Sequence, residues 1–81
     1  MHLLTSTVLL MDNQEVDYNL FFNPDTYRYL FYPASIAAAW YAFPSFWLYK
    51  KDKEWHLHGV QSDELKSQAV SHLTPFLKEA D

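Results

Sequence analysis

Two histidines, His56 and His58, stand one residue apart in the stretch EWHLHG. On a β-strand such side chains project from the same face, so this pair could share a metal ion or exchange protons. A zinc site needs at least a third protein ligand, and the spacing of His2, His72 and the acidic residues brings none of them to the pair. We therefore expect a strand face with aromatic neighbours, and no metal and no cofactor.

The sequence also lacks the residue types that other catalytic motifs need. The chain has no Cys, which removes thiol nucleophiles, and its single glycine, Gly59, argues against glycine-rich phosphate loops. No Ser lies in a G-x-S-x-G setting. The acidic stretch DNQEVDYN departs from a calcium-binding EF-hand loop, which needs Gly at its sixth position and Glu at its twelfth. These observations predict a protein that is not an enzyme.

Length and composition predict one small globular domain that spans residues 1–81. The chain is 49% hydrophobic and 19% aromatic, which is a globular rather than a disordered composition. Six Lys and Arg against ten Asp and Glu give a net charge of −4, the wrong sign for binding nucleic acid through its phosphates. Because a small secreted domain without Cys would lack disulfide staples, we expect a cytoplasmic protein.

Residues 29–49 carry no charge and lie between Arg28 and Lys50. Their length would suit a membrane-spanning helix. Pro33 and Pro44 interrupt the run, however, and a span needs a continuous helix with its backbone groups paired. We therefore expect a soluble chain with no membrane span.

The N-terminal third predicts a β-hairpin. Residues 3–11 are rich in Leu, Thr and Val, and residues 16–22 alternate between apolar and polar side chains. A two-residue and a three-residue loop would place opposite faces of the first strand on the core. The three-residue loop sets Leu10 opposite Val16 and gathers the apolar groups better, so it is favoured.

A type I turn is expected at NPDT, residues 23–26, because Pro fixes φ at the second position and Asn suits the first. A third strand, residues 27–32, should follow. Residues 34–42 are rich in Ala and follow Pro33, so they could form a short helix or continue the sheet.

Residues 46–50 and 54–58 predict a second hairpin with a two-residue loop. The pairing that this loop requires sets Tyr49 opposite His56 and Trp47 opposite His58 on one face, with Trp55 and Leu57 buried on the other.

A C-terminal helix should begin at Ser62, whose side chain can cap it, and Asp63 and Glu64 favour the positive end of the helix dipole. Pro75 cannot donate a backbone hydrogen bond, so the helix either kinks there or restarts with Thr74 as a new cap. The apolar residues of one helix face are Leu65, Ala69, Val70, Leu73, Phe76, Leu77 and Ala80.

The sequence thus predicts an α+β fold: an antiparallel sheet of about five strands, made of two hairpins and a third strand, with a C-terminal helix packed on one face. One helix covers one face, so aromatic residues should remain on the other. We expect that face to pair with a second copy or with another protein subunit. The alternative is a protein that binds a small molecule, such as a sugar or a flat ring. The candidate ligand or interface residues are Trp40, Trp47, Tyr49, His56 and His58.

Overall fold

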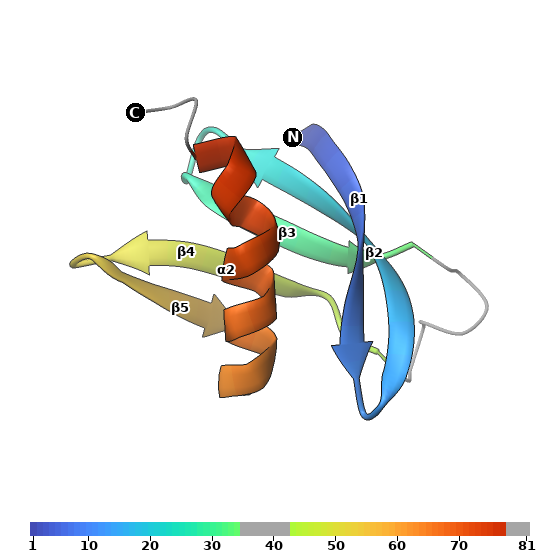
Figure 1. Cartoon of the computed structure of the whole chain (residues 1–81). Helices are drawn as coiled ribbons and strands as arrows, with labels where there is room; N and C mark the ends of the chain where they lie inside the picture. The colour runs from blue at the N-terminus through green and yellow to red at the C-terminus, as the bar shows by residue number, and fades with distance from the viewer. Residues whose placement is uncertain (35–42, 78–81) are drawn as a thin grey trace.

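The computed structural model describes residues 1–34 and 43–77. The five strands of these ranges are β1 (His2–Met11), β2 (Gln14–Asn23), β3 (Arg28–Pro33), β4 (Phe46–Lys51) and β5 (Glu54–His58), and their helix is α2 (Asp63–Leu77). Each strand pairs with the next one along the chain in a single antiparallel sheet (Figure 1). The predicted α+β fold is confirmed. The helix or strand proposed for residues 34–42 falls, apart from Ala34, outside the described residues.

Two-residue turns with positive φ close both outer hairpins. Asp12 and Asn13 have φ of 51° and 64°, and Asp52 and Lys53 have φ of 54° and 68°. Positive φ at both central residues is the geometry of a type I′ turn, whose twist matches that of the two strands it joins. The second hairpin therefore has the predicted loop, with Tyr49 opposite His56.

The prediction of a three-residue loop in the first hairpin is wrong. Leu10 pairs with Glu15, and Leu9 with Val16, as a two-residue loop requires. Asp and Asn tolerate positive φ better than most residues, so turn geometry outweighs the better gathering of apolar groups. As a consequence Leu9 is fully buried, while Val8 and Leu10 are 44% and 45% exposed on the other face.

The turn between β2 and β3 begins as predicted, at Asn23. Its Oδ1 accepts a hydrogen bond of 3.0 Å from the Asp25 N–H. Tyr27 has a φ of 55° and is not part of the strand. The third strand therefore starts at Arg28, one residue later than expected, and extends to Pro33.

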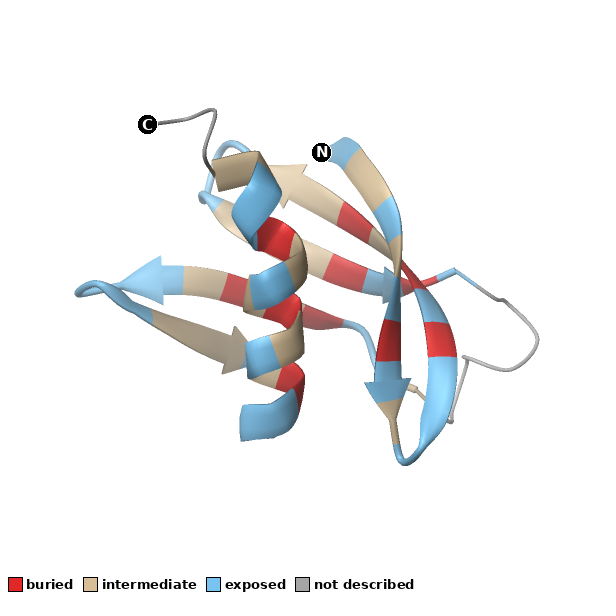
Figure 2. Ribbon diagram, in the orientation of Figure 1, coloured by how far each residue is buried: buried red, intermediate tan, exposed pale blue. Residues whose placement is uncertain are grey.

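The hydrophobic core lies between the sheet and α2 (Figure 2). Phe31 and Phe46, on neighbouring strands, stack with ring centroids 5.0 Å apart and planes 6° apart. Tyr18 lies against Phe46 at 5.7 Å. The buried hydrophobic residues are Leu9, Val16, Tyr18, Leu20, Phe31, Phe46, Leu48, Leu65, Ala69 and Leu73.

α2 begins where the sequence predicts. The Leu65 N–H donates to Ser62 Oγ at 3.2 Å, which is the expected cap. The helix runs through Pro75 to Leu77 without a restart. The Thr74 hydroxyl donates back to the Val70 carbonyl at 2.8 Å instead of capping a new helix.

The predicted apolar face of α2 is the one that meets the sheet. Leu65, Ala69 and Leu73 are buried, Val70, Phe76 and Leu77 are partly buried against the core, and Ala80 lies outside the described residues.

Gln68 joins α2 to the edge strand β1. The Leu10 N–H donates to Gln68 Oε1, and Gln68 Nε2 donates to the Leu10 carbonyl, both at 2.8 Å. The side-chain amide thus offers the same donor and acceptor pair as a neighbouring strand would. One helical turn later, His72 Nδ1 and Thr7 Oγ1 share a hydrogen bond of 2.8 Å. Both contacts hold α2 against the outermost strand of the sheet.

Replacing Gln68 should destabilise the fold. We expect Gln68→Ala to lower the free energy of unfolding by about 1 to 2 kcal/mol, because two hydrogen bonds to the Leu10 backbone are lost. Urea denaturation followed by circular dichroism measures this change. Ser67→Ala, at an exposed position on the same helix, is the matched control and should shift the value by less than about 0.5 kcal/mol. Equal effects from both variants would contradict a structural role for the amide.

The buried Tyr18 hydroxyl should make stability depend on alkaline pH. It donates to the Pro44 carbonyl at 2.8 Å, and burial raises its pKa from 10.0 to about 12. Because the pKa is higher in the folded chain, this group's contribution is complete below pH 10 and is lost between pH 10 and 12. Urea denaturation at pH 9 to 11.5 measures the loss. Tyr18→Phe should show a shallower decline over that range, whereas equal slopes would count against a buried hydroxyl.

Candidate functional site

One row of side chains crosses the whole sheet on the face opposite α2. Pairing between neighbouring strands aligns, from β1 to β5, Leu3, Phe21, Leu30, Trp47 and His58. Side chains alternate along a strand, and the buried residues of these strands point toward α2. We call these five residues the outer row. It holds four large apolar side chains in sequence across four strands.

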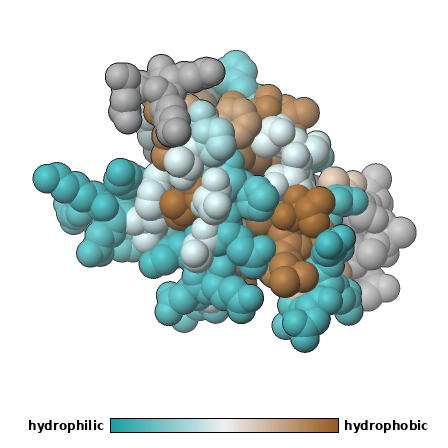
Figure 3. Space-filling model, in the orientation of Figure 1, coloured by the Kyte–Doolittle hydropathy of each residue, from teal (hydrophilic) through white to brown (hydrophobic). Residues whose placement is uncertain are grey.

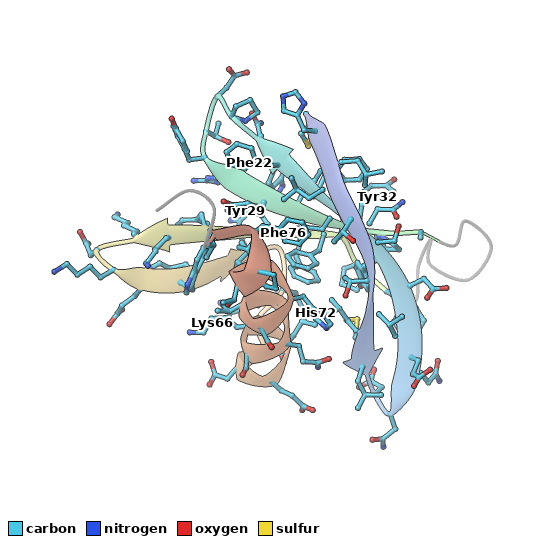
Figure 4. The ribbon with its side chains drawn as sticks, turned by 45° about the horizontal axis from the view of Figure 1, so that its top comes forward. Phe22, Tyr29, Tyr32, Lys66, His72 and Phe76 are labelled. Atoms are coloured by element: carbon cyan, nitrogen blue, oxygen red, sulfur yellow. The ribbon has the colours of Figure 1, made fainter. Side chains whose placement is uncertain are left out.

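Exposed apolar side chains extend this face from the row toward the Asp12–Asn13 turn. Leu3 and Tyr32 are 59% and 53% exposed, and Val8 and Leu10 add smaller fractions. Tyr32 pairs with Asn19, whose Oδ1 accepts a hydrogen bond of 2.8 Å from the Ser6 hydroxyl. In Figure 4, Tyr32 lies apart from the α2 residues Phe76 and His72. We call the whole sheet surface opposite α2 the outer face; it contains the outer row and these residues.

Arg28, Tyr49 and His56 form a stack across three strands of the outer face. The Arg28 guanidinium lies 4.5 Å from the centre of the Tyr49 ring, a cation–π contact. The His56 ring stacks on Tyr49 with centroids 5.4 Å apart and planes 24° apart. The planar groups fix one another, so this part of the face is held in place before any partner binds.

The structure places four of the five candidate residues. Trp47, Tyr49 and His56 are partly buried and His58 is exposed, all on the outer face, while Trp40 lies outside the described residues. Tyr49 and His56 are brought together in the stack, and Trp47 is the direct neighbour of His58. Trp55 and Leu57 face the helix side as predicted, but they are only partly buried.

Arg28 and Leu30 belong to the outer face and were not among the candidates. Both lie on β3, in the middle of the sheet, and their neighbours come from β2 and β4. The alternation of side chains along β3 is enough to predict that Arg28 and Leu30 share one face of the sheet. Their alignment with Trp47 and Tyr49, however, depends on the connection between β3 and β4, whose register no local pattern specifies.

Small hollows lie between the sheet and α2. Glu54, Trp55 and Lys66 contribute to one of about 510 Å³ between β5 and the helix. A second, of about 280 Å³, lies at the edge of β5 and includes Tyr49 and His56. Trp47 and His58 line neither hollow.

The helix side of the surface also carries apolar groups. Figure 3 shows hydrophobic side chains gathered between α2 and the β1–β2 hairpin. A hollow of about 290 Å³ lies there, and Leu10, Met11, Val60 and Leu65 are among its lining residues. Its polar lining groups are Asp12, Ser62 and Glu64, and the Ser62 hydroxyl is engaged in the cap of α2.

Within residues 1–34 and 43–77, no three or more His, Cys, Asp and Glu side chains gather where they could hold a metal ion. His56 and His58 therefore have no third ligand among these residues, and His56 is engaged with the Tyr49 ring. The same part of the chain contains no helix that is long and apolar enough to cross a membrane.

These elements define the class of protein: a small α+β domain in which a five-stranded antiparallel meander carries one C-terminal helix. Comparison of the chain with protein-family models, with curated proteins and with solved structures found no match. Function must therefore be inferred from the geometry of the described residues.

The two faces of β4 should respond differently to truncation. Leu48 is fully buried, so Leu48→Ala should cost about 2 to 5 kcal/mol of unfolding free energy. Trp47, on the outer face, is only partly buried, and Trp47→Ala should cost the monomer about 1 kcal/mol. Urea denaturation at low protein concentration measures both values. A loss from Trp47→Ala as large as that from Leu48→Ala would contradict the assignment of faces.

Proposed function

We propose that this protein is a non-enzymatic interaction module that associates with a second copy or with another protein subunit through its outer face. The observation that carries the proposal is the run of Leu3, Phe21, Leu30 and Trp47 across four neighbouring strands. α2 packs on the opposite face, and no other described element covers the row. Contiguous apolar patches of this kind mark interfaces more often than they stay in water.

The composition of the outer face suits a protein partner. Interfaces are enriched in aromatic residues and Arg, and the residues that contribute most to binding are most often Trp, Tyr and Arg. Trp47, Tyr49 and Arg28 supply all three types. Because Arg28 and His56 already hold the Tyr49 ring, little conformational freedom of this side chain is lost when a partner binds.

A thin core gives the chain a reason to associate. A domain of 81 residues buries only about 60 to 65% of the surface that its unfolded chain exposes. Burial of a second sheet face against a partner adds apolar contact that one helix cannot supply. The absence of Cys from the sequence supports a cytoplasmic setting, where disulfides are rare.

A small-molecule site is the second candidate function. The hollow that Tyr49 and His56 share at the edge of β5 favours it, since an aromatic wall with a few polar groups suits a sugar or a flat ring. The hollow is open and its size is near the lower end for ligand sites. Trp47, the largest aromatic group of the outer row, does not line it.

Light scattering over a concentration series, with and without zinc, tests the proposal. We expect a dimer that does not depend on zinc, and we expect Trp47→Ala to weaken it by about 2 kcal/mol, as truncation of a central aromatic residue does. Tyr27→Ala is the matched control, because Tyr27 is an exposed aromatic residue in a turn and lies off the outer row.

A monomer at every concentration would contradict self-association and favour the small-molecule site. A mass that increases only with zinc would instead assign His56 and His58 to a metal site shared between copies.

A further inference from the structure

We infer that the partner of the outer face is a second copy of this chain, bound face to face with its strands running in the opposite direction; this rests on the proposed function. The inference comes from the placement of charge on the outer face. Two acidic residues, Glu15 and Asp17, lie at one end of the strands. Two basic residues and Glu54 lie at the other end, with the apolar residues between them.

The acidic end is next to the Asp12–Asn13 turn. Glu15 and Asp17 pair with Leu10 and Val8, so their side chains are on the outer face, and both are exposed. At the opposite end of the sheet Arg28 begins β3 and pairs with Asn23.

Lys51 ends β4 at the same end of the sheet as Arg28, across from Glu54. The Asp52–Lys53 turn follows it directly. Because consecutive strands alternate in direction, the β2–β3 turn and the β4–β5 turn both lie opposite the β1–β2 turn (Figure 1). Arg28 and Lys51 contribute two positive charges and Glu54 one negative charge, so this basic end has a net charge of +1, against −2 from Glu15 and Asp17 at the acidic end.

Symmetry restricts how two identical faces can meet. In a twofold dimer the same patch is used by both copies, and for face-to-face packing the axis lies in the plane between the sheets. An axis parallel to the strands would bring the acidic ends of both copies together, and juxtaposed like charges are unfavourable. An axis across the strands brings the acidic end of each copy to the basic end of the other. The charge pattern therefore selects the antiparallel arrangement.

The spacing of residues agrees with that axis. Along β2, Asn23, the partner of Arg28, is six positions after Asp17, which is about 20 Å in an extended strand. The midpoint is at Leu20, between the level of the outer row and the level of Tyr32.

An axis at this midpoint brings Asp17 of each copy to the level of Arg28 of the other, with a lateral offset of one strand, about 4.8 Å. The Arg28 guanidinium lies on the Tyr49 ring of β4, on the other side of β3, so it must leave that ring to pair directly with the Asp17 carboxylate. The same operation places the exposed Tyr32 ring over Leu30 of the other copy. One rotation thus brings opposite charges together and covers the most exposed aromatic group of the outer face, while Phe21 comes to lie over Asn19 of the other copy.

Charge reversal tests the arrangement. We expect Asp17→Arg alone and Arg28→Asp alone each to increase the dimer dissociation constant at least about tenfold at low salt, because each homodimer then contains two like-charge contacts. An equimolar mixture of the two variants should form a heterodimer with near wild-type affinity, since both contacts in it are attractive. Sedimentation velocity and energy transfer between labelled chains measure the two results.

Glu64→Arg is the matched control. It makes the same change of charge as Asp17→Arg, but at an exposed position on α2, away from the outer face. It should change the dissociation constant less than about twofold. The antiparallel arrangement would be overturned if neither charge reversal changed the dissociation constant of the dimer. It would also be overturned if both reversals weakened the dimer and the mixture did not restore its affinity. Either result would leave the proposed interaction module unaffected. A wild-type chain that stays monomeric would overturn self-association and the antiparallel arrangement together.

Discussion

Positive φ at two pairs of turn residues sets the register of both outer hairpins, and the rest of the structure depends on that register. In a sheet, a slip of one residue exchanges the two faces of a strand. Asp12 and Asn13 place Leu9 under the helix and Leu10 outside, and Asp52 and Lys53 do the same for the neighbours Leu48 and Trp47. The core and the outer face are therefore two outcomes of the same local backbone geometry.

The helix α2 spans the sheet from one edge strand to the other. α2 contacts β1 and β5, the first and last strands in the order, so the buried side chains of the inner strands converge beneath it. No comparable element lies on the outer face among the described residues. The asymmetry explains why large apolar groups on one side of each strand are buried and those on the other side are left for another surface.

Local signals were sufficient for part of the fold. The β4–β5 register, the Ser62 cap and the apolar face of α2 all follow from residues close together in sequence. The β1–β2 register did not follow from apolar patterning, because the tolerance of Asp12 and Asn13 for positive φ decided the loop length. The apolar residues displaced by that choice became part of the outer face.

The candidate site was predictable only in part, for a related reason. The facing pairs of the second hairpin place Trp47, Tyr49, His56 and His58. Arg28 reaches Tyr49 from β3, and no short-range pattern specifies how β3 aligns with β4. Gly59 has a φ of 107°, which side-chain-bearing residues rarely adopt, and a Cβ there would lie 3.3 Å from the Ser45 carbonyl oxygen.

The amide of Gln68 links the exposure of an edge strand to the attachment of the helix. While α2 is docked, the Leu10 backbone is paired and cannot bond to another chain. When α2 lifts away, the core face and the free edge of a ten-residue strand rich in Leu, Val and Thr are exposed at the same time. Such a strand is a template for intermolecular β-pairing. Local opening of the helix is therefore the state from which this chain would aggregate, and exchange of the Leu10 amide hydrogen reports its population.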